Sequence, residues 1–308
     1  MSYEGGANDR NKINGNTNLY DVGAPGHLEL HYHHEMAQAG VSCESLAFSA
    51  INFHNLRAVS GQGQSWLSDG VMVTDEMRKT VLGKKLEKLG VCCIRNFTDA
   101  DHFQDKTGNW RDWKYLMKNR ADPEQYPVNP GDRVYYNHWQ QAFNTSDPKT
   151  AILKAKSQNF KASFTNNILH TKLFLDAYEY FPLLNKNILF FNVAEHGTWF
   201  DTHIGIDKLP HIGCDEVGSE FHRPYKLVLG DMSEFSYEEL EEWSEVYCKH
   251  GFQVGGEAGM ETGDISIFCN FRFAHGRPGY RLEEGQKREI GVVIGKQFIR
   301  NGAKESSW

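Results

Sequence analysis

The chain has 308 residues, of which 40% are hydrophobic and 13% aromatic, so it can bury a large core without disulfides. Its 40 acidic side chains outnumber its 33 basic ones and give a net charge of -7. This balance argues against a nucleic-acid binder or an anionic-membrane binder, because either class needs a basic surface. The six cysteines have no C-x-x-C spacing, and the start contains no apolar run, so we expect a reduced, cytoplasmic setting.

The first predicted elements follow from composition and hydrophobic periodicity. Residues 1–20 are rich in Gly and Asn and predict a mobile arm that packs against nothing. The alternation in HLELHYHHEM, from His27, predicts a half-buried strand, and SLAFSAINF predicts a second one. The run TDEMRKTVLGKKLEKLG predicts one helix that is capped by Thr74 and closed by Gly90.

The second half of the chain continues this pattern. VCCIRNF predicts a short buried strand, and residues 100–165 form a long polar and aromatic insertion that we expect to cover a site as a lid. SYEELEEWSEVYCKH predicts a helix, and DISIFCNFRFA and REIGVVIGKQFI predict two strong strands. Short strands with few helices predict a mainly β fold with helical decorations, built on a barrel or jelly roll.

The residues with the clearest chemistry form an H-x-E pair, His33 and Glu35. On a strand these two side chains point to the same side, where an imidazole and a carboxylate can hold a divalent metal. His275 is the candidate third ligand, expected at the end of the strand that follows the Gly263-Asp264 turn. Two histidines and one carboxylate leave positions open on an octahedral ion, as in non-haem Fe(II) oxygenases. An H-x-E pair also arises often by chance, and His275 by itself fits a hydrogen-bonded structural role better than a metal site.

Arg288 adds a second feature to this set. It lies thirteen residues after His275, on the next predicted strand. Its planar guanidinium can bind a carboxylate through two parallel hydrogen bonds. The combination of the three candidate ligands and this arginine is more specific than any of its parts.

With these candidate residues identified, the sequence resembles the TauD/TfdA family of Fe(II)/2-oxoglutarate oxygenases, and within it the clavaminate synthase-like group. The matching segments, in order, are HHEM at 33–36, GQSWLSDG at 63–70, KLEKLGVCCIRNF, FFN at 190–192, GD at 263–264 and HGR at 275–277. They extend over nearly the whole chain, from about residue 20 to residue 300. The resemblance therefore implies a single oxygenase domain over residues 21–308, with a double-stranded β-helix (jelly roll) core.

The resemblance also implies roles for particular residues. His33, Glu35 and His275 would hold Fe(II), and Arg288 would bind the distal carboxylate of 2-oxoglutarate. Ser65 stands where the family usually has a threonine that hydrogen-bonds this carboxylate, and it keeps the hydroxyl.

Arg277 is a further candidate for binding the co-substrate or a substrate carboxylate, with an ion pair to an acidic neighbour as the alternative. For contact with substrate the candidates are Gln38, Trp110 and Asn192, each of which equally suits packing or support of the pocket. His31 and His34 are expected behind the ligands or at the surface.

The implied activity consumes 2-oxoglutarate and O2 and releases succinate and CO2. The expected substrate is a small polar molecule, such as an amino acid or a natural-product intermediate of secondary metabolism, oxidised by hydroxylation, desaturation or cyclisation. Halogenating relatives lack the carboxylate ligand, so Glu35 argues against halogenation. Nucleic acid and membrane are not expected as partners, and a homo-oligomer stays open.

One departure from the family concerns the start of the sequence. Family members commonly carry a longer segment before the H-x-E pair, whereas here 32 residues precede His33. The flanking layer is then absent, supplied by a partner subunit, or replaced by the 100–165 insertion. A non-catalytic metal-binding barrel that acts as a scaffold is therefore the alternative function, and a zinc or manganese hydrolase is a third that Arg288 argues against.

Overall fold

The computed structural model of the chain describes residues 13, 18–21, 30–54, 64–97, 139–192, 225–255, 259–280 and 282–302. Trp110 and most of the 100–165 insertion lie outside the described residues.

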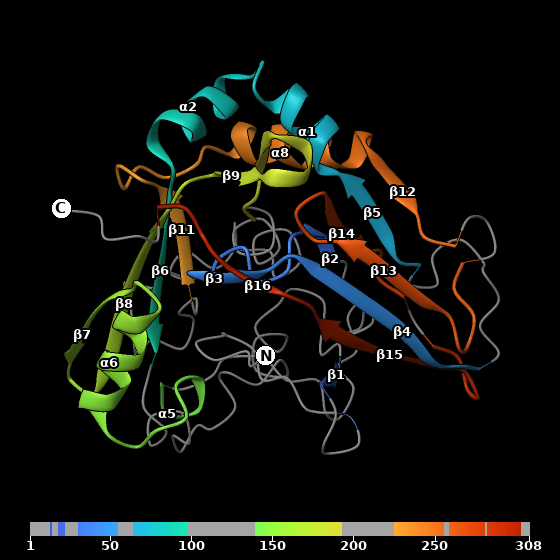
Figure 1. Cartoon of the computed structure of the whole chain (residues 1–308), viewed down its shortest axis with the longest axis horizontal. Coiled ribbons are helices and arrows are strands. Elements are labelled where there is room, and N and C mark those ends of the chain that lie inside the picture. Colours follow the sequence, from blue (N-terminus) through green and yellow to red (C-terminus); the bar gives the residue numbers. More distant parts are fainter. Residues whose placement is uncertain are drawn as a thin grey trace, which may run out of the picture.

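The centre of the fold is a pair of four-stranded antiparallel sheets, drawn on the right of Figure 1. The first sheet has the order β1 (Leu19–Asp21), β15 (Lys287–Ile294), β4 (Ser45–His54), β13 (Ile265–Cys269). The second has the order β12 (Gly251–Gln253), β5 (Trp66–Asp69), β14 (Phe273–Arg277), β2 (Leu30–His33). Neighbours in these sheets are far apart in sequence, so the chain closes on itself rather than forming a simple meander.

An apolar core fills the space between these two sheets. Phe48 of β4 packs against Phe268 of β13, with ring centroids 5.3 Å apart, and Leu67 of β5 meets them from the second sheet. Ile290 and Val292 of β15 belong to the same buried cluster. Two facing antiparallel sheets around one core form a jelly roll, which confirms the predicted fold class.

A third antiparallel sheet and two short strand pairs lie beside the jelly roll. The third sheet, on the left of Figure 1, has the order β11 (Tyr225–Leu229), β6 (Val91–Phe97), β8 (Ile168–Leu175), β7 (Lys161–Thr165). The strand pairs are β9 (Tyr178–Phe181) with β10 (Lys186–Leu189) and β3 (Val41–Cys43) with β16 (Gln297–Ile299). Every residue of β6 is buried, including the polar Arg95 and Asn96, in agreement with the short buried strand predicted for VCCIRNF.

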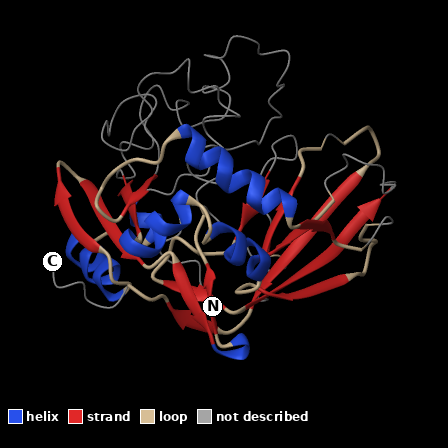
Figure 2. Cartoon of the chain, turned by 90° about the horizontal axis from the view of Figure 1, so that it is seen from above, coloured by secondary structure: helices blue, strands red, loops and turns tan. Residues whose placement is uncertain are grey.

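The helices lie in more than one place, as the view from above shows (Figure 2): some lie between the two groups of strands, and others lie beside the third sheet, on the left of the view. They are α1 (Gly70–Met77), α2 (Val81–Leu89), α5 (Trp139–Ala142), α6 (Pro148–Ser157), α8 (Tyr237–Lys249) and the short 3-10 helix η1 (Pro182–Leu184). Trp243 and Tyr247 of α8 are buried in the largest core cluster, together with Met77 of α1 and Leu173 of β8. Helix α8 has the capping box that its sequence suggests, formed by Ser236 and Glu239.

The prediction of one helix capped by Thr74 is wrong, because the chain forms two helices here. Helix α1 begins after Asp69, whose side chain accepts from the Val71 N–H, and α2 begins after Thr80 in the same way. Thr74 lies inside α1, where its hydroxyl donates to the Gly70 carbonyl. The apolar spacing runs on across the break, so periodicity alone did not reveal it. Gly90 does end α2, with a φ of 62°.

The segment DISIFCNFRFA is two strands, not the one that was predicted. A turn at residues 270–272 separates β13 from β14, so His275 lies in the middle of β14 and not at the end of the strand after Gly263-Asp264. The sequence hides this turn because it contains a phenylalanine and no glycine or proline.

Two predicted segments overlap with the described fold. Leu19 and Tyr20, at the end of the expected arm, lie in β1, and the Tyr20 ring is buried in the jelly-roll core, so this end of the arm does pack. The last part of the insertion, residues 139–165, contains α5, α6 and β7, and β7 pairs with β8. The lid itself stays a prediction.

Two further observations concern the helices and the cysteines. No helix among the described residues is both long and apolar enough to cross a bilayer. The five cysteines in the described part of the chain are free thiols.

Candidate metal centre

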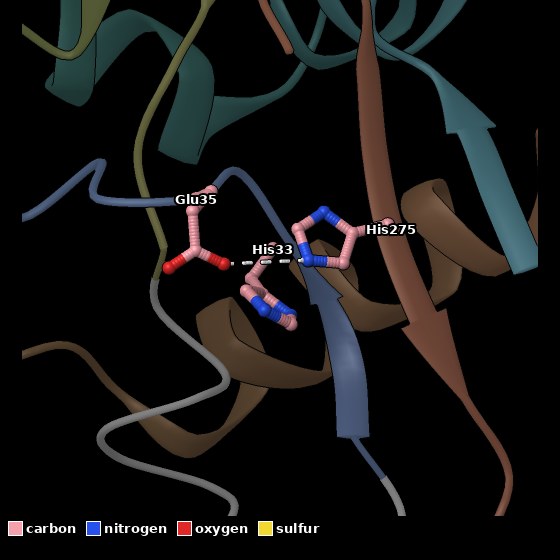
Figure 3. A group of neighbouring side chains, drawn as sticks. All are labelled: His33, Glu35 and His275. Atoms are coloured by element: carbon pink, nitrogen blue, oxygen red, sulfur yellow. Dashed lines mark ion pairs between the residues drawn. The ribbon is translucent and has the colours of Figure 1, made fainter. Parts of the chain in front are cut away.

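Three predicted ligands meet at one point of the fold. His33 is the last residue of β2, and His275 lies directly opposite it in the antiparallel pairing of β2 with β14. Glu35 follows two residues after His33, and all three side chains are buried. Their candidate ligand atoms lie within 4.8 Å of one another, and Glu35 Oε2 is 3.7 Å from His275 Nε2 (Figure 3).

The position of Glu35 differs from the prediction in one respect. The strand ends at His33, so Glu35 lies in a turn and not two places along the same pleated face. The next residue, Met36, has a φ of 57°, a left-handed conformation that non-glycine residues rarely adopt. The turn carries the carboxylate back toward the two imidazoles, as Figure 3 shows.

The hydrogen bond of His33 sets which nitrogen can bind a metal. Its Nδ1 lies 2.8 Å from the carbonyl oxygen of His31. Because a carbonyl only accepts, Nδ1 carries the hydrogen and Nε2 keeps its lone pair. Metal-binding histidines in proteins are commonly oriented by such a bond. His31 therefore supports the ligand through its backbone, in agreement with its expected place behind the ligands.

The ring of His275 is held from the opposite sheet. Phe48 and Phe268 pack against it, with ring centroids at 5.1 and 5.7 Å. The next residue is Gly276, where a Cβ atom would lie 2.7 Å from the carbonyl oxygen of Leu30. Glycine at this position lets β14 approach β2 closely enough for the two histidine rings to meet, with centroids 4.1 Å apart.

His34 turns away from the ligands and into the protein. Its ring packs against Phe190, with centroids 4.6 Å apart, and its Nδ1 donates to the carbonyl of Asn270 at 2.6 Å. Burial lowers the pKa of His34 to about 3, so the imidazole is neutral at physiological pH. It has the supporting role that was expected.

Two arginine side chains, those of Arg277 and Arg288, approach one aromatic ring, that of Tyr280. Arg288 lies on the same face of β15 as Ile290, toward the core between the sheets. Its guanidinium lies over Tyr280 at 4.9 Å and over Phe53 at 5.6 Å, and that of Arg277 lies over Tyr280 at 5.0 Å. Burial lowers the pKa of Arg288, while the Tyr280 hydroxyl raises it.

The remaining candidate residues for co-substrate or substrate contact are Ser65, Asn192 and Gln38. Ser65 directly precedes β5, and its carbonyl accepts from the Val254 N–H at 2.8 Å. Asn192 and Gln38 contact each other, with Asn192 Nδ2 donating to Gln38 Oε1 at 3.3 Å. Asn192 also hydrogen-bonds the backbone of His34, so its observed contacts support the segment between the candidate ligands His33 and Glu35.

Sequence reasoning missed Asn270 altogether. Its buried side chain bonds the backbone of Glu35, although it lies 235 residues away along the chain. An asparagine five residues before a candidate ligand was the available signal.

Several solved structures are similar to this chain. A taurine dioxygenase from Burkholderia xenovorans matches with 9% identity and a TM-score of 0.40, over 92% of this chain and 64% of that one. A protein described as an α-ketoglutarate-dependent 2,4-D dioxygenase, from the same organism, matches with 12% identity and a TM-score of 0.38, over 86% and 66%.

An asparagine oxygenase in complex with Fe(II), 2S,3S-3-hydroxyasparagine and succinate matches with 10% identity and a TM-score of 0.43, over 90% and 56%. The chain thus spans less than two thirds of the length of each of these three proteins. No family model and no curated protein matches the sequence.

Proposed function

We propose that the protein is an Fe(II)- and 2-oxoglutarate-dependent oxygenase that oxidises a small polar molecule. The observation that carries this proposal is the convergence of His33, Glu35 and His275 within 4.8 Å. Two imidazoles and one carboxylate suit Fe(II) and leave coordination positions open for a co-substrate and O2. The hydrogen bond of His33 Nδ1, which leaves Nε2 available, fits the same assignment.

Each residue near the site has a proposed task. His33, Glu35 and His275 hold the metal, and Glu35 contributes a negative charge that partly balances it. Arg288 and Ser65 bind the distal carboxylate of 2-oxoglutarate, and Arg277 binds a carboxylate of either the co-substrate or the substrate. When bound, Fe(II) supplies an O2-dependent oxidation in which 2-oxoglutarate becomes succinate and CO2, and the second oxygen atom enters the product or leaves as water.

The proposed substrate is an amino acid or a natural-product intermediate. Arg277 supports this choice, because it is buried, its guanidinium lies over the same Tyr280 ring as that of Arg288, and a guanidinium can bind a carboxylate. Gln38, Asn192 and Trp110 remain candidates for substrate contact. We propose hydroxylation as the outcome, with desaturation or cyclisation starting from the same hydrogen removal, in the cytoplasm.

Turnover of 2-oxoglutarate without any added substrate tests this function. The protein, with Fe(II) and air, is expected to release succinate above the level of the same protein treated with a chelator. Succinate is measured by chromatography. Tight binding of Fe(II) without any consumption of 2-oxoglutarate would instead support the non-catalytic barrel.

Arg288→Lys is expected to weaken 2-oxoglutarate binding roughly tenfold to a hundredfold, because a lysine cannot make two parallel bonds and a lost charge-assisted bond costs about 1.5–3 kcal/mol. The measurement is the KM for 2-oxoglutarate in succinate release. Metal affinity should not change, and Lys287→Met, at the exposed neighbour, is the control. An unchanged KM in the Arg288 variant would remove this residue from the co-substrate site.

A further inference from the structure

The backbone between the first two ligands leaves the sheet and needs other hydrogen-bond partners. Strand β2 ends at His33, so the N–H and C=O groups of His34 and Glu35 no longer pair along the ladder. These residues are buried, and an unpaired buried backbone group is costly. Two asparagine side chains supply the partners.

Asn192 holds the backbone of His34 through both ends of its amide. Its Oδ1 accepts from the His34 N–H at 2.8 Å, and its Nδ2 donates to the His34 carbonyl at 2.9 Å. The Asn192 side chain therefore replaces a neighbouring strand at this residue, because an amide has the same donor and acceptor as a peptide group. It belongs to the segment that directly follows β10.

Asn270 holds the backbone of Glu35 in the same manner. Its Oδ1 accepts from the Glu35 N–H at 2.9 Å, and its Nδ2 donates to the Glu35 carbonyl at 3.1 Å and to the Cys43 carbonyl at 2.9 Å. The Glu35 carbonyl also accepts from the Ser42 hydroxyl at 2.9 Å. Both backbone polar groups of Glu35, its N–H and its carbonyl, are thus hydrogen-bonded.

The location of Asn270 connects the two parts of the metal centre. It lies in the turn between β13 and β14, and β14 carries His275. Its own carbonyl accepts from His34 Nδ1. The turn that leads into the strand with the third ligand is therefore bonded to the segment between the first two, and this segment continues into the left-handed turn at Met36.

We infer that Asn192 and Asn270 are positioning residues, which set the separation and direction of His33 and Glu35 toward the metal by holding the two residues after β2. This inference rests on the proposed metal centre. Asn270 has the greater effect, because it bonds the residue that provides a ligand. Neither asparagine side chain needs to touch the metal or the substrate to act in this way.

The test uses the purified full chain, Co(II) as the probe, and the variants Asn192→Leu and Asn270→Leu. Leucine keeps a similar size and removes the hydrogen bonds. Each variant is expected to bind Co(II) roughly tenfold to a hundredfold more weakly, the range found when supporting hydrogen bonds of metal ligands are removed. The visible absorption bands of bound Co(II), which report ligand geometry, should shift in both variants.

A stability-matched control separates positioning from general destabilisation. Thr171→Val removes a buried hydroxyl that donates to the Arg95 carbonyl in the third sheet, and it should lower the unfolding free energy of the metal-free protein without changing Co(II) affinity or spectrum. Asn187→Leu, on the exposed part of β10, is the surface control.

The outcomes are distinguishable. Folded asparagine variants that keep the wild-type Co(II) affinity and spectrum would overturn the inference and leave the metal centre intact. A folded wild-type protein that takes up no Co(II) would contradict the proposed function itself. If Asn270→Leu does not fold, Asn270→Ser and Asn192→Leu give the same comparison.

Discussion

Replacing Glu35 by alanine is expected to remove Fe(II) binding and O2-dependent succinate release together. Glu35 is the one carboxylate of the three-residue group, so the variant leaves two neutral imidazoles facing a divalent ion. Loss of an indirect supporting bond costs about tenfold to a hundredfold in metal affinity, and the loss of a ligand should exceed the upper end of that range. The measurements are equilibrium metal binding and succinate formed per protein.

The matched control for this variant is Glu44→Ala. Glu44 is partly exposed and pairs with Lys296 at 2.8 Å on the surface, so its removal should leave both readouts unchanged. The unfolding free energy of the metal-free Glu35→Ala protein should stay close to that of the wild type, which would assign the loss to the metal. Full succinate release by Glu35→Ala would show that the chemistry takes place elsewhere.

Replacing Arg300 by methionine is expected to destabilise the protein by about 3–5 kcal/mol, the cost of breaking a buried ion pair from one side. The Arg300 side chain is fully buried and pairs with Glu179. It also donates to the carbonyls of Ala37, Asp176 and Phe190. Burial raises the pKa of the Glu179 carboxyl, and the charge of Arg300 opposes this rise. The variant therefore leaves the Glu179 carboxyl buried without its cationic partner.

Urea unfolding of the metal-free protein measures this effect. The double variant Arg300→Met with Glu179→Gln should lose less stability than the two single changes added together, because the acid no longer stands alone. Lys296→Met breaks an exposed pair and should cost less than about 1 kcal/mol. A loss below about 1 kcal/mol for Arg300→Met would mean that the pair contributes little, as some buried ion pairs do.

Arg300 also bears on function through the turn after Glu35. Its bond to the Ala37 carbonyl holds the segment that contains the left-handed Met36. The C-terminal end of the described chain thus supports the same turn that places the carboxylate. A defect in stability and a defect in metal binding are therefore expected together in this variant.

The candidate metal ligands could be selected from sequence because their chemistry depends on residue type and order, and the structure brings the three side chains together. His33, Glu35 and His275 occur in this order and are followed by an arginine thirteen residues later. This combination is more specific for a metal and carboxylate site than any of its residues alone. The jelly roll followed from short alternating strands, and the structure confirms it. The asparagines could not be ranked in this way, because their role depends on bonds to backbone groups 158 and 235 residues away.

The errors in the predicted elements concern where the elements begin and end. The break between α1 and α2 and the turn between β13 and β14 both lie in segments without glycine or proline at the bend, so the residues that most often mark a break were missing there. Glu35 left the strand because its backbone found side-chain partners in Asn270 and Ser42. Thr80 starts α2 by local capping, whereas the end of β2 depends on tertiary contacts.

The most direct test of the central claim is an anaerobic titration of the wild-type protein with Fe(II) and then 2-oxoglutarate. Co-substrate bound to the metal should give a weak visible metal-to-ligand absorption band that requires both additions. The band should be absent in His275→Ala and should need more 2-oxoglutarate in Arg288→Lys. A folded wild-type protein that shows no band, or that binds 2-oxoglutarate equally well without Fe(II), would contradict the claim.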